Sequence, residues 1–279
     1  MVSSVLDRPG IRLSARELLA LRNEPRPPNG HRPASRRPGV VSARLPGSGM
    51  DLREIRAFSE GDDTRRIDPA ASARTGTLHV RSFHEDRDDA VLLIADFRPE
   101  MLWGTGAALR SVRAARLLAR RGWDAVARGA SVAGMSIGSA GIAALSARTG
   151  VRQFGLIAEM LAQEHDRALE DRSSPPSLAA ALVQAARLAP HGAKVWLATG
   201  PEGILAGDEQ ALARLARRRQ VTLLCPLDPM EVFPPGSALP ICSGGASRIA
   251  RLRPFEPGPL VSRMRGLNVT VEVLADDAG

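Results

Sequence analysis

The stretch VLLIAD, residues 91–96, decides the fold of this chain. Its five consecutive apolar residues show no polar alternation, and such a run is typical of a strand that is buried on both faces of a parallel sheet. The run ends at Asp96. In open parallel sheets, ligands bind beyond the carboxyl ends of the strands, so Asp96 marks the first place to look for a site.

Working outward from residues 91–96, apolar runs and helical patterns alternate along most of the chain. Two further buried strands are predicted at 193–198 and 221–225, and helices at 106–128, 151–165, 177–189 and 208–218. The other expected elements are a helix at 14–23, a strand from Leu78 to Phe83, a hairpin or pair of edge strands at 131–137 and 142–148, and a strand, helix and strand at 247–252, 256–265 and 268–274.

This alternation predicts an α/β fold: a doubly wound, mostly parallel sheet with helices on both faces, preceded by an N-terminal extension. Its ligand-bearing edge should combine the residues that follow two buried strands. The segments to inspect are 96–100 and 199–202.

The composition limits the classes of function. Apolar residues make up 44% of the chain, but aromatic residues only 3%, and Tyr is absent, which argues against binding by aromatic stacking. Cys225 and Cys242 are too few and too far apart for a metal cluster, and two reduced thiols are expected. Because no run of about 18 apolar residues and no signal pattern occurs, we expect a cytoplasmic protein.

Residues 1–45 are predicted to be a basic, Pro-rich extension that is partly flexible. Residues 1–48 contain nine Arg against three acidic residues, so this part carries +6 of the chain's formal charge of +8. A basic arm of this kind can bind nucleic acid or an anionic membrane, with an affinity that falls as salt rises. No recognition helix, zinc-finger spacing or RNA-binding aromatic motif accompanies it.

Between Gly47 and Arg74 the chain reads GSGMDLREIRAFSEGDDTRRIDPAASAR, which is dense in Gly, Asp and Arg. The interleaved charges favour a structural clasp, because pairing with Arg holds an Asp ionised rather than poised for proton transfer. A partner-docking surface and a catalytic carboxylate site are the alternatives. The residues that define the motif are Gly47, Gly49, Asp51, Glu54, Arg56, Gly61, Asp62, Asp63, Arg65, Asp68, Ser72 and Arg74.

Together with Val80, Phe83 and Glu85, these spacings resemble the hallmark of the bacterial domain-of-unknown-function family 58. The chain departs from the family pattern at Pro69, where Trp is usual. The resemblance extends over about residues 46–275 and divides the chain into the extension 1–45, the motif block 46–87 and a von Willebrand factor type A-like domain at 88–279. It also implies work beside a MoxR-type AAA+ ATPase, in assembling or remodelling other proteins.

Type A domains commonly bind a divalent cation through an Asp-x-Ser-x-Ser loop, a Thr loop and a later Asp, and such oxygen ligands suit Mg²⁺. Here the first loop reads Asp96-Phe97-Arg98-Pro99-Glu100, so both Ser positions are lost. At the third loop Thr199 stands where Asp is usual.

The second loop departs as well, since Pro176 stands at the expected Thr, with Ser174 and Ser177 as imperfect substitutes. We therefore expect a degenerate, metal-free site in which Arg98 pairs with Asp96 or Glu100. The alternative is that Asp96, Glu100 and Ser177 bind Mg²⁺ together with water. The degenerate site comprises Asp96, Arg98, Glu100, Ser177 and Thr199.

The sequence offers no enzymatic constellation. The five His show no paired ligand spacing, and no Gly-x-Ser-x-Gly elbow or phosphate-binding Gly-rich loop occurs. The favoured hypothesis is a non-enzymatic interaction or assembly factor, without a cofactor, whose partner is a MoxR-type ATPase or that ATPase's client. The alternatives are nucleic-acid or anionic-membrane binding through the basic arm and, with less support, a metal-dependent hydrolase.

Overall fold

The structure is a computed structural model that describes residues 10–24, 52–59, 62–83, 89–171, 173–243 and 246–275. The chain divides into two compact units. Residues 1–24 and 89–279 form the larger one, here called the sheet unit, and residues 25–88 form the smaller one, here called the clasp unit.

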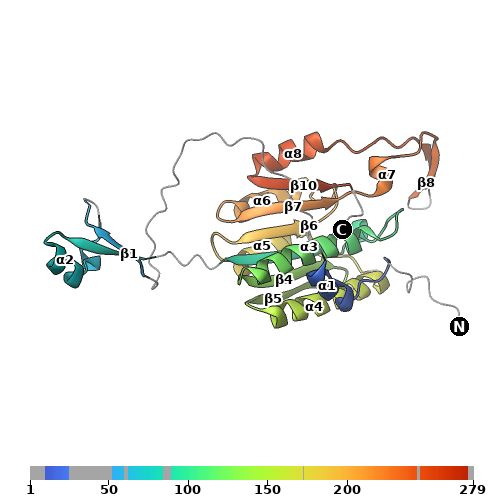
Figure 1. Ribbon diagram of the computed structural model, residues 1–279. Helices are drawn as coiled ribbons and strands as arrows, with labels where there is room; N and C mark the ends of the chain where they lie inside the picture. Colours follow the sequence, from blue (N-terminus) through green and yellow to red (C-terminus); the bar gives the residue numbers. More distant parts are fainter. Residues whose placement is uncertain are drawn as a thin grey trace. The chain divides into compact units, whose positions relative to one another are not determined.

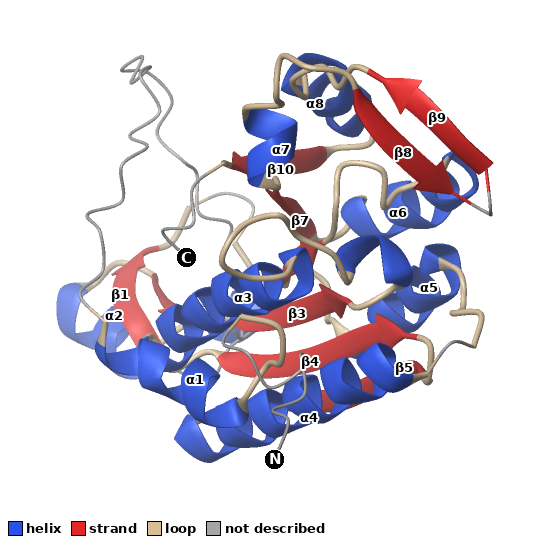
Figure 2. Ribbon diagram, turned by 90° about the vertical axis from the view of Figure 1, so that its right-hand side faces the viewer, coloured by secondary structure: helices blue, strands red, loops and turns tan. Residues whose placement is uncertain are grey.

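A six-stranded sheet organises the sheet unit, in the order β10-β7-β6-β3-β4-β5 (Figures 1 and 2). All neighbours are parallel except β4 and β5, which are antiparallel. The strands are β3 (Ala90–Asp96), β4 (Ser131–Gly138), β5 (Gly141–Arg148), β6 (Lys194–Ala198), β7 (Gln220–Pro226) and β10 (Val269–Leu274). The order of connection reverses between β3 and β6, which places the switch point of a doubly wound sheet there.

The predicted central strand is confirmed. β3 is buried along its whole length and pairs with β4 on one side and β6 on the other, so that Leu92 lies opposite both Ala133 and Val195. The doubly wound α/β fold expected from the sequence is therefore present.

Helices cover both faces of this sheet. Leu93 faces a core formed with α3 (Arg110–Ala127) and α4 (Val151–Glu170). Its neighbour Leu92 faces a second core formed with α5 (Leu178–Leu188), α6 (Glu209–Ala216) and α8 (Pro257–Gly266). Gly122 lets α3 and α4 approach closely, because a Cβ there would lie 2.2 Å from Cε2 of Phe154.

Residues 10–24 pack onto this core, although the sequence placed them in a separate extension. Ser14 caps α1 (Ala15–Ala20), which continues into the 3-10 turn η2 (Leu21–Asn23). Leu13, Leu18 and Leu21 are buried, and Trp123 Nε1 donates a hydrogen bond of 2.9 Å to the Leu18 carbonyl. The helix predicted at 14–23 is thus confirmed, but the domain boundary at residue 45 is wrong for these residues. The predicted connector at 24–46 lies almost entirely outside the described residues.

Three features of the sheet unit differ from the sequence-based expectation. The hairpin predicted at 131–137 and 142–148 is confirmed by the antiparallel pair of β4 and β5, but the alternative of two edge strands is wrong, since β4 also pairs with β3. Helix α4 continues to Glu170. Between β7 and α8 lie α7 (Pro229–Val232), β8 (Leu239–Ser243) and β9 (Ala246–Ala250), of which only β9 was predicted, and β8 and β9 form a separate antiparallel pair.

The clasp unit is built on two antiparallel strands, β1 (Leu52–Ala57) and β2 (His79–Phe83). Between them lie η3 (Thr64–Arg66) and α2 (Pro69–Thr75). Asp68 caps α2, and Gly76 ends it with a φ of 72°, the left-handed conformation that Gly adopts without strain. Pro69 occupies the first position of this helix, where the missing N–H costs nothing.

No helix among the described residues is both long and apolar enough to cross a membrane.

Candidate functional site

The carboxyl ends of β3 and β6 meet at the switch point of the sheet, and Asp96 and Thr199 lie there. Asp96, the last residue of β3, is 1% exposed, and Thr199, the first residue after β6, is fully buried. Thr199 Oγ1 donates a hydrogen bond of 2.5 Å to Asp96 Oδ2. The two loops that the sequence singled out are thus joined by a direct contact.

Arg98 binds the same carboxylate with two nitrogens. Its Nε donates to Asp96 Oδ1 over 2.9 Å and its Nη2 to Asp96 Oδ2 over 2.7 Å. The Arg98 backbone N–H adds a third bond, of 3.0 Å, to Oδ1. The ion pair between Arg98 and Asp96 that the sequence predicted is therefore present, and it is buried.

Gly203 completes the site and was missed by the sequence reasoning. Its carbonyl accepts a hydrogen bond of 2.6 Å from Arg98 Nη2. A Cβ at this position would lie 1.9 Å from Thr199 Oγ1, so only Gly leaves room for the threonine hydroxyl. The Gly200-Pro201-Glu202-Gly203 stretch carried a signal for a turn, and Gly203 N–H does bond to the Gly200 carbonyl at 3.0 Å.

The charge of Arg98 is secured by its surroundings. Burial alone would lower the pKa of the guanidinium, but the hydrogen bonds and charge of Asp96 oppose this. The nearby carboxylates of Glu100 and Asp208 act in the same direction, and the pKa of Arg98 is raised overall. The guanidinium thus stays cationic at the place where the family resemblance would put a metal ion.

Protein groups occupy both oxygens of Asp96, the carboxylate that a cation would need. Each oxygen of Asp96 already accepts two hydrogen bonds: Oδ1 from the backbone N–H and Nε of Arg98, and Oδ2 from Arg98 Nη2 and Thr199. A carboxylate saturated in this way has no oxygen lone pair left for a metal. In the described ranges, moreover, no group of three or more His, Cys, Asp or Glu is arranged to hold one.

The other two residues of the predicted site do not bond to Asp96. Glu100 is exposed in η4 (Pro99–Met101). The Ser177 hydroxyl caps α5, accepting a bond of 3.3 Å from the Ala180 N–H. The start of α5 is also bonded by Asp208, at the end of η5 (Ala206–Asp208), which accepts a bond of 2.8 Å from the Ala179 N–H of α5. Ser177 therefore serves the start of a helix.

A second polar cluster at this edge ties the loop after β3 to the end of β7. Arg110, the first residue of α3, lies over the Trp103 ring at 4.5 Å and forms an ion pair with Glu231. Asp228 accepts hydrogen bonds from the Thr105 N–H at 2.8 Å and from the Met230 N–H at 3.0 Å. This cluster was not anticipated, because its members come from segments more than a hundred residues apart.

Apolar side chains are exposed on the loops of the same edge. Trp103 is 38% exposed, Leu205 64% and Phe233 84%. They follow β3, β6 and β7 respectively. The edge thus combines internally paired charges with apolar side chains that are open to solvent.

In the clasp unit, Arg56 and Asp62 form a second two-nitrogen pair. Arg56 Nη1 and Nη2 donate to the two oxygens of Asp62 over 2.8 Å and 2.6 Å. Asp62 also accepts a bond of 2.8 Å from the Ser59 N–H. The bond from Arg56 and that from Ser59 lower the pKa of Asp62 below its ordinary value.

Asp68 and Ser72 connect α2 to β2. The Asp68 carboxylate caps α2 through the Ala71 N–H at 2.9 Å and accepts a bond of 2.8 Å from Arg81 Nε. The Ser72 hydroxyl donates to the Asp68 carbonyl at 2.7 Å and accepts from the His79 N–H at 2.9 Å. Of the motif residues, Arg56, Asp62, Asp68 and Ser72 thus bond to groups inside the unit, as the structural-clasp hypothesis expects.

The rest of the motif is less informative. Asp63 accepts a bond of 3.0 Å from the Arg65 N–H and opens η3. The side chains of Arg65 and Arg74 are exposed. Outside the described residues lie Gly47, Gly49, Asp51, Gly61 and the side chain of Glu54.

Comparison with curated proteins gives short matches. The chain is 39% identical over 61 residues to uncharacterized proteins of Mycobacterium bovis and Mycobacterium tuberculosis. The match includes 22% of this chain and 19% of each relative, so the chain spans about a fifth of the length of the curated relatives it matches.

Among solved structures, a conserved hypothetical protein, BatB, from Bacteroides thetaiotaomicron is 17% identical, with a TM-score of 0.43 over 68% of this chain and 92% of that one. An aerotolerance-related membrane protein from Bacteroides fragilis has 17% identity and a TM-score of 0.45 over 67% and 92%. A von Willebrand factor type A protein from Catenulispora acidiphila has 14% identity and a TM-score of 0.41 over 71% and 40%.

The family resemblance noted in the motif block extends well beyond it. The model of the family described as "Protein of unknown function DUF58" matches residues 54–238, which include the larger part of β1 and the strands from β2 to β7. The match covers more than half of the chain, and the chain therefore belongs to the DUF58 family.

Proposed function

We propose that this chain is a non-enzymatic interaction or assembly factor that acts with a MoxR-type AAA+ ATPase or with that ATPase's client. The observation that carries the proposal is the state of the switch-point edge. Asp96 lies in the position where open α/β sheets bind ligands. Both of its carboxylate oxygens accept hydrogen bonds, from Arg98 and from Thr199. Such a saturated, buried pair is suited to holding two loops together.

The same edge supplies the groups that a protein partner could contact. Trp103 and Leu205 stand on the loops after β3 and β6 and are 38% and 64% exposed. Tryptophan is among the residues that most often dominate the energy of protein interfaces. The ion pair of Arg110 with Glu231 and the stacking of Arg110 on Trp103 fix the loop that presents this side chain.

In this proposal the altered cation site is degenerate, and the partner contacts the edge without a bridging metal. The guanidinium of Arg98 already supplies positive charge beside Asp96 and the Gly203 carbonyl. A divalent cation would have to displace it against two hydrogen bonds and a buried ion pair.

A pull-down from native lysate tests the proposal. The full chain is expected to recover an AAA+ ATPase, and Leu205→Asp to recover much less, because a charge in the contact surface opposes docking. Leu156→Asp is the matched control, since Leu156 is 53% exposed on α4, away from the switch-point edge. Recovery of no ATPase by any of the three, or equal recovery by all, would contradict the proposal.

The alternative is electrostatic binding through the basic arm. Fewer arginines of this arm are open to an anionic partner than the sequence suggested. Arg12 is paired with Asp166 at 3.1 Å and with Glu170 at 3.3 Å, and Arg22 lies over the Trp123 ring at 5.5 Å. These two side chains already have partners within the sheet unit. Salt separates the two proposals, because arm binding should weaken from low to moderate ionic strength while apolar docking at Leu205 should not.

A further inference from the structure

The segment between β7 and α8 carries the two most exposed large apolar side chains of the described residues. Phe233, just after α7, is 84% exposed, and Ile249, in β9, is 80% exposed. Neither α7 nor the β8–β9 pair belongs to the six-stranded sheet. These side chains therefore protrude from a segment that the core of the fold does not require.

Within this segment the stretch from Phe233 to Phe255 carries only positive charge, and Asp228, Glu231 and Glu256 flank it. Residues 233–255 contain Arg248, Arg251 and Arg253 and no Asp or Glu. All three arginines are exposed, and none is paired with a carboxylate of the described residues. Elsewhere in the sheet unit pairing is common, as for Arg121 with Glu272 at 2.5 Å and Arg263 with Glu209 at 2.6 Å.

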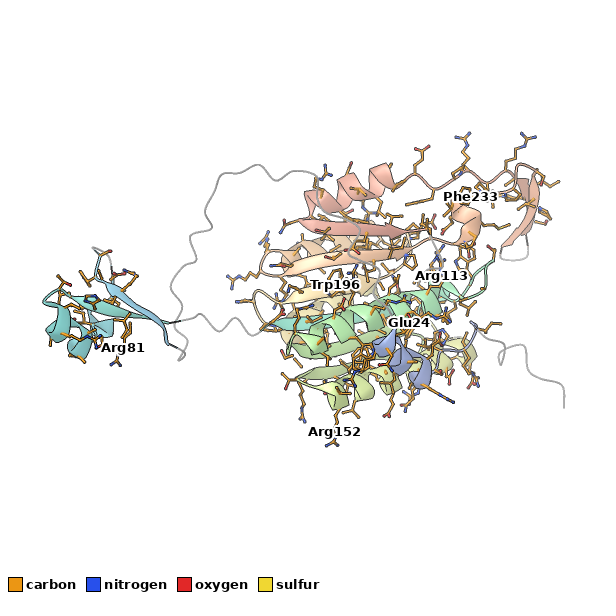
Figure 3. The ribbon with its side chains drawn as sticks, in the orientation of Figure 1. Glu24, Arg81, Arg113, Arg152, Trp196 and Phe233 are labelled. Carbon is orange, nitrogen blue, oxygen red and sulfur yellow. The ribbon has the colours of Figure 1, made fainter. Side chains whose placement is uncertain are left out.

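A backbone contact brings the two ends of this segment together. The Phe255 N–H donates a hydrogen bond of 2.7 Å to the Glu231 carbonyl of α7. Phe233 follows Glu231 by two residues and Arg253 precedes Phe255 by two, so both lie close to this bond. Figure 3 shows Phe233 on the side of the sheet unit opposite to Arg152.

The β8–β9 ribbon is only two strands wide. Ile249 pairs with Pro240 across it, and because side chains alternate along a strand, Arg248 projects from the other face. An Arg side chain is long enough to reach past the edge of so narrow a ribbon and to keep its guanidinium at the level of the apolar face. Arg251 follows directly after the strand.

We propose that Phe233, Arg248, Ile249, Arg251 and Arg253 form a docking surface for an anionic phospholipid bilayer. Phe233 and Ile249 would enter the boundary between headgroups and acyl chains, and the arginines would bind the lipid phosphates. Arg suits this role because its planar guanidinium forms two parallel hydrogen bonds to a phosphate.

The isolated positions of Phe233 and Ile249 favour a bilayer over an acidic protein as the partner. An acidic partner could also neutralise the three arginines. Phe233 and Ile249, however, stand singly on two different elements, whereas a packed protein interface requires a matching recess for each protruding side chain. A fluid bilayer accommodates both without any prior fit.

Sedimentation with phospholipid vesicles tests this surface on the full chain. The protein should bind vesicles of mixed phosphatidylglycerol and phosphatidylcholine and should not bind phosphatidylcholine alone. Binding should weaken as salt rises, because the arginines contribute through charge.

Variants connect the binding to the named residues. The double variant Phe233→Ser with Ile249→Ser should lower vesicle binding by at least about ten-fold, since it removes both inserting side chains. Arg251→Gln should lower it by about five-fold. Leu156→Ser and Arg152→Gln, at exposed positions of α4, are the matched controls and should bind as the unchanged chain does. Thermal unfolding should be unchanged in all of these variants, because every altered side chain is exposed.

Three results would overturn the proposal. One is equal binding to anionic and neutral vesicles, or binding to neither. Another is full vesicle binding by the Phe233/Ile249 double variant together with loss of binding by Arg36→Gln with Arg37→Gln, which would assign the effect to the basic arm. The third is binding to polyglutamate but not to vesicles, which would make the surface a site for acidic proteins. The outcome is independent of ATPase capture, since none of these variants alters Leu205.

Discussion

Arg98 and Arg56 each bind an aspartate through two nitrogens, at similar distances, but in different surroundings. In the sheet unit the side chains of Arg98 and Asp96 are 9% and 1% exposed, whereas in the clasp unit those of Arg56 and Asp62 are 38% and 17% exposed. When one partner of a buried ion pair is removed, the other is left as an uncompensated charge in the core. When one partner of an exposed pair is removed, water solvates the other. The same contact therefore organises a core in one unit and only restrains a turn in the other.

Removal of the buried guanidinium should have the largest effect. Arg98→Ala leaves Asp96 buried beside Thr199 without its cationic partner, and we expect the free energy of unfolding to fall by about 3–5 kcal/mol. Urea denaturation followed by tryptophan fluorescence measures this in the sheet unit alone, because Trp103, Trp123 and Trp196 all lie there. Arg152→Ala, at an exposed position, should change little. A loss of less than about 1 kcal/mol for Arg98→Ala would mean that the pair behaves as an exposed one.

Acid should weaken the sheet unit through His165. This side chain is fully buried in α4, lies 2.9 Å from the Ser111 hydroxyl through Nε2, and meets the Phe97 ring edge-on at 5.1 Å. Burial, with a smaller effect of Arg12, lowers the pKa of His165 to about 4 from the ordinary 6.5. Between these two values the unfolded chain binds a proton that the folded chain does not, so the free energy of unfolding decreases as pH falls.

The size of this effect is up to about 3 kcal/mol across that window. His165→Gln removes the titrating group, and the fluorescence-monitored free energy of unfolding should then vary less with pH between 6.5 and 4. An unchanged pH dependence in this variant would show that His165 is accessible to protons in the folded state.

The clasp unit should respond to acid in a lower range. Because the bonds from Arg56 and Ser59 lower the pKa of Asp62 from the ordinary 3.8, the stability they add is present above that pH and is lost as pH falls below it. Hydrogen exchange at the Ser59 amide, which donates to Asp62, reports this region directly.

Asp62→Asn should raise exchange at Ser59 at neutral pH and leave tryptophan fluorescence unchanged, an effect well below that of Arg98→Ala. Asp63→Asn is the matched control, since Asn can still accept the bond from the Arg65 N–H, whereas Asp62→Asn also removes the ion pair with Arg56. If Asp62→Asn unfolded the whole chain, the exposed pair would contribute as much to the free energy of unfolding as the buried pair does. The contrast between the two units would then be wrong.

Addition of Mg²⁺ should have the smallest effect of all. With both oxygens of Asp96 occupied, calorimetric titration of the unchanged chain should show no binding in the low micromolar range. Low-micromolar binding would mean that the guanidinium of Arg98 yields to a cation and that the degenerate-site proposal is wrong. Arg98→Ser sharpens the test, since it frees the carboxylate and restores a hydroxyl at this loop position.

The sequence predicted those parts of the molecule whose signal is local. The unbroken apolar run of residues 91–96 identified the central strand, and the helical spacing after it identified α3. The pairing of Arg98 with Asp96 was predictable as well, because a long cationic side chain two residues beyond a carboxylate can fold back onto it. Neither inference requires knowledge of distant segments.

What the sequence missed depends on distant segments or on short elements. The Gly203 carbonyl reaches Arg98, and Glu231 reaches Arg110, only once the sheet has formed. The helix at residues 15–20 was predicted, but its site between α3 and α4 is created by those helices. Helix α2 was not predicted, because it has only seven residues and Ala71 is its buried side chain, so the sequence shows no apolar helical spacing.

The chain enters and leaves the clasp unit from the same body, since residues 10–24 pack on the sheet unit and residue 89 leads into β3. Any partner that pulled on the clasp unit would therefore load two anchors of unequal strength. The first is a helical segment held by three leucines and by the pairs of Glu17 with Arg116 and Glu24 with Arg120. The second is the central strand of the sheet, paired on both sides. Under tension the first anchor would peel away while the second held.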